Sequence, residues 1–175
     1  QQTAGIATLP VPCHVRDIVQ HGNTLYYIDG TCLYTSNDLQ TWAKVDYADA
    51  SFTPINMLMS YNGHAWCILQ DKTNEQLLLG IITDSIRPMK NIADMDNGYL
   101  PTTFPINDFA ALEFSSSSER PRAMIVGGRA LNGEIVKSRW NLEYTTYADN
   151  GDTYRLKDFS IAQPAFQSLT GVSII

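Results

Sequence analysis

The residues best suited to chemistry are two arginines and a Glu–Tyr pair in the last third of the chain. Arg129 and Arg139 carry guanidinium groups that can hold a carboxylate through paired hydrogen bonds. Tyr144 supplies a phenol that could act as a nucleophile, and Glu143 supplies a carboxylate that could act as its base. Their spacing forms no motif, and nothing among the eighteen acidic residues marks a carboxylate pair for glycoside hydrolysis. The sequence therefore predicts no catalytic residue, and these four are expected to be ordinary turn and outer-strand residues.

The three histidines are the next candidates, because imidazole binds metals and transfers protons near neutral pH. They are His14, His21 and His64. His21 and His64 fall in similar polar turns, "QHGN" and "NGHA". A shared metal or ligand site is one interpretation, and two solvated turns are the preferred one. The acids between residues 84 and 96 lack the spacing of a calcium-binding loop. No metal and no cofactor is predicted.

Tyrosines in predicted turns offer a binding surface of another kind. Aromatic rings on exposed loops stack on sugars or anchor protein partners. Five tyrosines fall in such turns: Tyr47, Tyr61, Tyr99, Tyr144 and Tyr147. The residues predicted to bind a ligand are Tyr61, His64, Tyr144 and Tyr147. The alternative is that these rings are partly buried between neighbouring sheets.

The composition disfavours several kinds of partner. The 175-residue chain has a net charge of −6, and its nearest basic cluster, Arg120, Arg122 and Arg129, is interrupted, so no nucleic-acid partner is expected. No apolar run reaches the roughly 18 to 20 residues of a membrane span. The first residues lack the pattern of a signal peptide, which predicts a processed or excised piece. The three cysteines are an odd number, which favours buried free thiols over a disulfide framework.

Short apolar runs separated by polar turns extend along the chain, and helical periodicity is nearly absent. These runs repeat in three units, residues 15–45, 55–92 and 109–159. Each unit is predicted to contain four strands, and the second and third apolar runs are followed by a more polar closing strand: "WAKV", "MKNI" or "YRLKDF". In the third unit, "EIVKSRW" is the predicted third strand. The units differ in length mainly in their turns, where a structural repeat tolerates insertions.

Units of this size with four strands are typical of the blades of a β-propeller. A four-stranded sheet cannot bury both of its faces alone, so blades stack on one another around an axis. The strongly apolar runs "LYYI", "WCIL" and "MIVGG" fit strands that are covered on both sides. The sequence therefore predicts an all-β fold, a single propeller segment over residues 1–175 with about three antiparallel blades. A β-sandwich is the alternative, because its short strands would give similar local patterns.

One turn carries a more specific motif. The stretch "SNDLQTW", between the third and fourth strands of the first unit, resembles the Asp-box, a turn motif of the form S-x-D-x-x-T-W found in sialidase-like and other bacterial propellers. The resemblance gives its structural positions to Ser36, Asp38, Thr41 and Trp42. It implies that the Ser and Asp side chains hold the turn and that the Trp ring packs between blades. A weaker copy in the third unit has its corresponding positions at Asp149, Gly151, Thr153 and Tyr154.

The third unit also contains "MIVGGRALNGEIVKSRW", which resembles a kelch-type repeat. In that pattern a strand ends in Gly127 and Gly128, a polar turn follows, and a second strand ends in Trp140. Together the two motifs resemble uncharacterised secreted bacterial propeller proteins of sialidase-like architecture. The resemblance implies a fold and a stable turn. It does not imply sialidase activity, because that family's catalytic motif is missing.

Residues 168–175 resemble the first strand of a further unit. Propellers typically close with roughly four to eight blades, so we expect other blades to complete the ring, from a longer parent protein or from another copy. The predicted function is that of a non-enzymatic binding or scaffold module of a secreted, cell-surface or periplasmic protein, with a glycan or a protein as ligand. A glycan-active hydrolase of sialidase-like architecture is the alternative.

Overall fold

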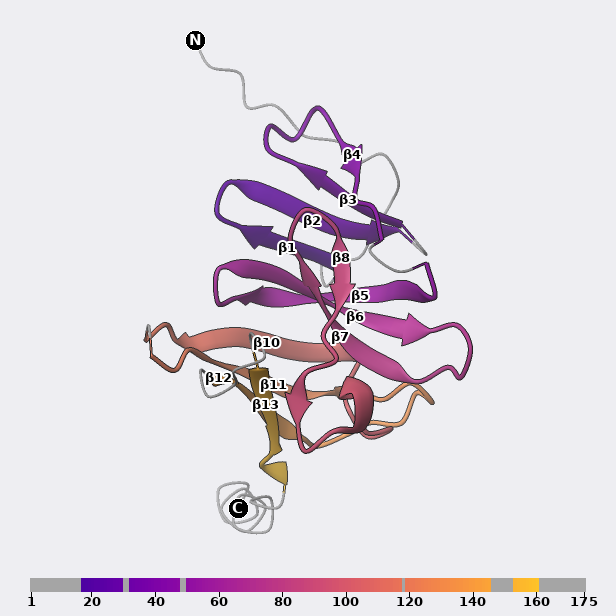
Figure 1. Ribbon diagram of the computed structural model, residues 1–175, viewed down its shortest axis with the longest axis vertical. Helices are drawn as coiled ribbons and strands as arrows, with labels where there is room; N and C mark the ends of the chain where they lie inside the picture. Colours follow the sequence, from indigo (N-terminus) through magenta and orange to yellow (C-terminus); the bar gives the residue numbers. More distant parts are fainter. Residues whose placement is uncertain (1–16, 30–31, 48–49, 118, 146–152, 161–175) are drawn as a thin grey trace, which may run out of the picture.

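Three β-sheets follow one another along the chain and stack face to face (Figure 1). The structure, a computed structural model, describes residues 17–29, 32–47, 50–117, 119–145 and 153–160. The predicted all-β fold and its four-stranded antiparallel sheets are confirmed, and a two-layer sandwich does not describe three stacked sheets. No helix in the part of the chain that the structure describes is long and apolar enough to cross a membrane.

The strands pair in sequence order within each sheet. The first sheet contains β1 (Ile18–His21), β2 (Thr24–Asp29), β3 (Cys32–Ser36) and β4 (Ala43–Lys44). The second contains β5 (Phe52–Tyr61), β6 (His64–Asp71), β7 (Leu77–Ile82) and β8 (Ile86–Pro88). The third contains β10 (Asn107–Ser115), β11 (Arg122–Arg129), β12 (Arg139–Thr145) and β13 (Thr153–Asp158), with the short β9 (Ile92–Ala93) at its edge. The 3-10 turn η2 (Asp96–Gly98) precedes the third sheet.

The first strand of each sheet lies at the point where the sheets meet. β5 contacts β1 on one side and β10 on the other. The β1–β2, β5–β6 and β10–β11 turns lie together on the left in Figure 1, and the β6–β7 and β11–β12 connections lie on the right. Sheets joined along their first strands, with corresponding turns on the same face, have the relative placement of neighbouring blades around an axis.

The central strands of the second sheet are covered on both faces, which explains their continuous apolar sequence. All six residues of β7 are buried. Alternate residues of a strand point to opposite faces, so Leu78 packs with the cluster shared with the first sheet, and Leu77 and Leu79 pack with the cluster shared with the third. On β6, Cys67 faces the first sheet and Trp66 the third.

Close packing within this sheet requires a glycine at position 80. Gly80 lies directly opposite Cys67 in the β6–β7 ladder. A Cβ atom at Gly80 would lie 2.7 Å from Cys67 Sγ and 2.8 Å from Leu69 Cγ. The Cys67 thiol is fully buried, and burial raises its pKa to about 12, which makes it a poor nucleophile. Cys32, also free, is half-buried, and Cys13 lies outside the described residues.

Two strands differ from their predicted positions. The closing strand of the second sheet is β8, Ile86–Pro88, and "MKNI" was the wrong prediction: Ile92 instead belongs to β9, which pairs in parallel with β13 of the third sheet. In the third sheet the regular third strand begins only at Arg139. Gly127 and Gly128 have positive φ angles of 71° and 100°, and this backbone conformation interrupts the regular ladder opposite "EIVKSRW".

The packing around position 80 generates a stability prediction. Gly80→Ala should lower the free energy of unfolding by about 1–3 kcal/mol, because the added methyl overpacks a filled interior. Urea unfolding measures this. The double variant Cys67→Ala/Gly80→Ala should lose less stability than the sum of the two single variants, since the smaller side chain at position 67 makes room. An unfolding midpoint for Gly80→Ala equal to that of the parent would contradict this account of the packing.

Candidate functional site

The β3–β4 turn is held by two side chains that accept backbone hydrogen bonds. Ser36 Oγ accepts from the Leu39 N–H at 2.8 Å, and Asp38 Oδ1 accepts from the Thr41 and Gln40 N–H groups at 2.7 and 2.9 Å. These bonds from Thr41 and Gln40 lower the pKa of Asp38 from 3.8 to about 2. Short polar side chains satisfy a tight turn in this way without any distant contact. The role of Ser36 and Asp38 seen here is structural.

Trp42 follows the β3–β4 turn and packs against the first sheet. Its ring is half-buried and meets Tyr27 edge-on, with ring centroids 5.0 Å apart. Tyr27 pairs with Ile18 and Tyr34, whereas the alternate residue Ile28 packs toward the second sheet. Trp42 therefore covers the face of the first sheet that points away from the second. The β3–β4 turn thus lies over this outer face of the first sheet, and packing of Trp42 against a further blade stays a prediction.

The weaker motif copy is only partly described. Asp149 and Gly151 lie outside the described residues, and Thr153 and Tyr154 begin β13. Tyr154 is fully buried and its ring lies 4.9 Å from that of Trp66 in a T-shaped contact between the second and third sheets. Thr153 accepts a hydrogen bond from Thr145 Oγ1 through its backbone oxygen. Both residues thus join strands.

The three described residues of the predicted ligand-binding set do not form an exposed surface. Tyr61 was predicted in a turn but ends β5 and is only 1% exposed, so that prediction was wrong. Tyr144 lies in strand β12 and not in a turn; it is half-buried, with its ring 5.2 Å from that of Tyr154. His64 begins β6, half-buried, with Nδ1 2.9 Å from the Asn62 carbonyl oxygen. Tyr147 lies outside the described residues.

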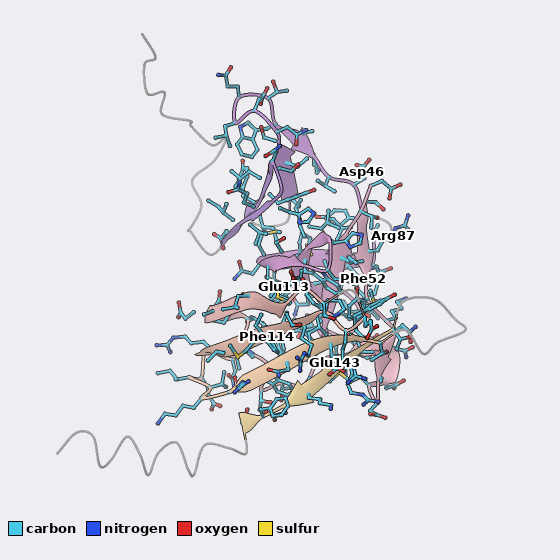
Figure 2. All side chains as sticks on the ribbon, turned by 90° about the vertical axis from the view of Figure 1, so that its left-hand side faces the viewer. Asp46, Phe52, Arg87, Glu113, Phe114 and Glu143 are labelled. Atoms are coloured by element: carbon cyan, nitrogen blue, oxygen red, sulfur yellow. The ribbon has the colours of Figure 1, made fainter. Side chains whose placement is uncertain are left out.

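Tyr61 is buried because it joins the second and third sheets. Its hydroxyl donates to the Pro121 carbonyl at 2.5 Å, and burial raises its pKa well above the ordinary value. In the next turn the Asn62 N–H donates to Glu113 Oε2 at 2.8 Å, and the Asn62 side chain donates to the Tyr154 hydroxyl at 2.8 Å. Figure 2 shows Glu113 beside the second sheet. These residues tie the two sheets together.

The groups suited to catalysis are separated and engaged elsewhere. Arg129 forms an ion pair with Asp108 at 3.1 Å, and Glu143 forms one with Arg120 at 3.0 Å. Arg139 lies over the Phe159 ring. Glu143 pairs with the first residue of β11, whereas Arg129 is the last residue of that strand, so the two lie at opposite ends.

One pair that the sequence did not single out is His21 with Ser60. His21 Nδ1 lies 2.7 Å from Ser60 Oγ, which links the ends of β1 and β5. His21 and His64 both lie on the face that carries the β1–β2 and β5–β6 turns, as their matching turn positions predict. His14 lies outside the described residues. No group of three metal-ligating side chains forms within the described ranges.

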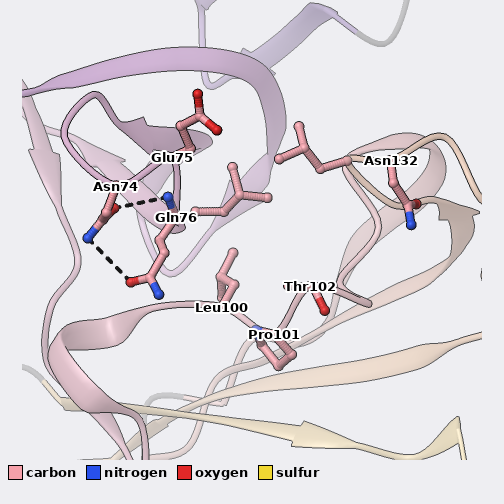
Figure 3. Close-up of a pocket in the computed structure, with 9 residues that line it drawn as sticks. Asn74, Glu75, Gln76, Leu100, Pro101, Thr102 and Asn132 are labelled. Carbon is pink, nitrogen blue, oxygen red and sulfur yellow. Dashed lines mark hydrogen bonds between the residues drawn. The ribbon is translucent and has the colours of Figure 1, made fainter.

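A cleft opens on the other face and has a volume of about 490 Å³ (Figure 3). Three connections form it: the β6–β7 turn, the segment after η2 and the β11–β12 hairpin. They supply nine lining residues: Asn74, Glu75, Gln76, Leu77, Leu100, Pro101, Thr102, Leu131 and Asn132. The lining thus combines leucines with amides, a hydroxyl and one carboxylate.

Hydrogen bonds fix the polar wall of this cleft. Asn74 Oδ1 accepts from the Gln76 N–H at 3.0 Å, and Asn74 Nδ2 donates to the Tyr99 hydroxyl at 3.2 Å. Tyr99 in turn donates to Asp71 Oδ2 at 2.9 Å. A backbone hydrogen bond from Thr73 lowers the pKa of Asp71, which keeps it an acceptor. Tyr99, one of the tyrosines predicted in turns, therefore supports this wall.

The cleft has no contiguous signature in the sequence, because its lining comes from three separate segments, residues 74–77, 100–102 and 131–132. Each segment taken alone has the composition of an ordinary turn. The one available signal was the location of the segments: all three belong to connections on the same side of successive repeat units.

Stacked four-stranded sheets that meet along their first strands define a protein of the β-propeller class. The comparison with known families agrees: the sequence model of the DUF6242 beta propeller domain matches residues 1–161. The chain belongs to this family. No curated protein and no solved structure matches the chain.

The β3–β4 turn yields a pH prediction. Because the folded pKa of Asp38 lies below its ordinary value, the carboxylate's contribution to the turn is complete above about pH 4. It is lost as the pH falls through about 2. NMR titration should therefore show the Asp38 carboxyl and the Thr41 amide moving with a shared midpoint near 2. Asp38→Asn should remove this titration of the Thr41 amide, and Gln40→Ala should retain it. A midpoint near 4 would contradict the hydrogen-bonding scheme.

Proposed function

We propose that this chain is a non-catalytic binding module whose ligand site is the cleft between the β6–β7 turn, the segment after η2 and the β11–β12 hairpin. The observation that carries the proposal is the cleft itself, about 490 Å³ in volume and lined by both apolar and polar side chains. Ligand sites are commonly concave, mostly apolar, and furnished with a few oriented polar groups. A glycan and a protein are the two ligand classes considered.

We also propose specific repeat motifs and a location for the protein. The Ser36–Asp38 turn supports an Asp-box, and the Gly127–Gly128 strand end supports a kelch-like repeat. Both motifs, and the scarcity of charged side chains at 17% of residues, fit a bacterial protein that is secreted, surface-exposed or periplasmic. The hydrolase alternative would need the arginines and Glu143 to converge, and their separate ion pairs make it the weaker candidate.

The three sheets are proposed to be three blades of a larger ring. The third sheet directs apolar side chains away from the second: Leu112, Phe114 and Val126, which are 49%, 41% and 39% exposed. Figure 2 shows Phe114 on this outermost sheet. The predicted unit start at residues 168–175 lies outside the described residues. Blades from a parent protein or another copy would cover such a face.

Ligand mapping by NMR tests the binding function. A pool of oligosaccharides and a pool of capped short peptides are each added to isotope-labelled protein. We expect amide shift changes confined to residues 74–77, 100–102 and 131–132 with at least one pool, and no cleavage of either pool. Shift changes centred on the Asn62–His64 turn, changes with neither pool, or released reducing sugars would contradict the proposal.

Light scattering tests the larger ring. The 175-residue chain should self-associate with rising concentration, because its third sheet exposes leucine, phenylalanine and valine together. The double variant Leu112→Lys/Val126→Lys should reduce this association. Ile135→Lys should not, since Ile135 is 68% exposed in the β11–β12 connection and lies outside this set of residues. An unsubstituted 175-residue chain that stays monomeric with high thermal stability would contradict the proposal.

A further inference from the structure

We infer that the cleft binds an extended peptide segment that inserts an aliphatic side chain between Leu77, Leu100 and Leu131. This inference rests on the binding function proposed above and narrows its ligand from two classes to one. Three properties of the lining support it: an aliphatic floor, hydrogen-bond donors on opposite walls, and a single acidic group.

The floor of the cleft is aliphatic. Leu77 and Leu100 are almost fully buried, and Leu131 at the tip of its hairpin remains 48% exposed. Figure 3 shows Leu100 between Gln76 on one side and Thr102 and Asn132 on the other. None of the nine lining residues is aromatic. A sugar ring gains most of its binding free energy by stacking its C–H face on an aromatic ring. An aliphatic side chain instead gains binding free energy by burial against leucines.

The polar walls offer donors from two sides. Asn132 Oδ1 already accepts the Glu134 N–H at 3.0 Å, which orients the side chain and leaves Nδ2 to donate outward. On the other wall, Gln76 Nε2 donates to no described residue. Figure 3 shows Gln76 and Asn132 on opposite sides of the leucines. An extended peptide presents its carbonyl oxygens alternately to either side, so one such segment can accept from both amides.

The charge of the lining restricts the class of peptide that can bind. Glu75 is the one ionisable group in the lining. Its carboxylate, on an exposed turn, favours a neutral or basic segment over an acidic one, by an amount that salt would reduce. The ligand class is therefore a neutral or basic peptide with an aliphatic residue at its centre.

The cleft is shaped before any ligand arrives. The Leu100 N–H donates to the Leu77 carbonyl at 2.8 Å, which attaches the segment after η2 to β7. The Glu75 N–H donates to the Asp71 carbonyl at 2.8 Å, and the Gly133 N–H donates to the Ala130 carbonyl at 2.9 Å. All three connections are thus closed by backbone hydrogen bonds. A site ordered in advance loses less conformational freedom on binding.

The test uses capped pentapeptides of glycine and serine whose central residue is leucine, alanine or glutamate. NMR titration of the 175-residue chain gives each dissociation constant and the amides that shift. We expect the leucine peptide to bind at residues 74–77, 100–102 and 131–132. The alanine peptide should bind roughly tenfold or more weakly, because it loses most of the buried aliphatic surface. The glutamate peptide should bind more weakly still.

Variants of the protein supply the second arm. Leu131→Ser should weaken the binding of the leucine peptide severalfold. Ile135→Ser, a change in the same hairpin but outside the lining, should leave its affinity unchanged. Asn132→Asp keeps the acceptor for the Glu134 N–H but removes the outward donor, so it should lower the affinity for neutral peptides. Each variant changes an exposed side chain, and the amide spectrum reports that the fold is retained.

Chito- and cello-oligosaccharides provide the competing arm. If they shift the cleft amides and the peptides do not, the peptide inference is overturned and the binding function stands. If neither class shifts these amides, both are overturned. Peptide binding that Leu131→Ser leaves unchanged, or leucine and alanine peptides of equal affinity, would overturn the inference alone.

Discussion

Burial of the second sheet on both faces is the constraint on which the structure depends. Strands β6 and β7 have alternate side chains in two separate apolar clusters, one shared with the first sheet and one with the third. Each fully buried Leu or Ile contributes roughly 1.5–3 kcal/mol relative to exposure, whereas a typical hydrogen bond contributes about 1 kcal/mol net. Stacking of the sheets, and not bonding within turns, therefore supplies most of the stability.

Apolar contacts have little directionality, so polar contacts must fix how the sheets align. Asn56 is almost fully buried and donates to the Ile106 carbonyl at 2.9 Å. Where β5 ends, Tyr61 bonds to Pro121, the residue before β11, and Asn62 bonds to Glu113 of β10. Leaving such buried groups unpaired costs about 1–3 kcal/mol each, which penalises any sliding of one sheet along the other.

The cleft is a consequence of this alignment. Once the second and third sheets are held side by side, their β6–β7 and β11–β12 connections emerge on the same face, with the segment after η2 between them. Connections on a rigid scaffold can vary in side chain without disturbing the core. On the opposite face the Asn62–His64 turn is occupied by contacts with the third sheet, and Tyr61 serves packing.

The sequence by itself determined the features that depend on near neighbours. The alternation of short apolar runs and polar turns fixed an all-β chain of four-stranded sheets, and Ser36 and Asp38 lie within five residues of the amides that they bind. The tertiary structure decided what depends on distant partners. Tyr61 is buried by Pro121 and Tyr154, β9 pairs with the distant β13, and the cleft combines segments up to 58 positions apart, from 74 to 132. Local patterns reflect hydrogen bonds and strand periodicity within a few residues, whereas the exposure of a side chain depends on which sheet packs over it.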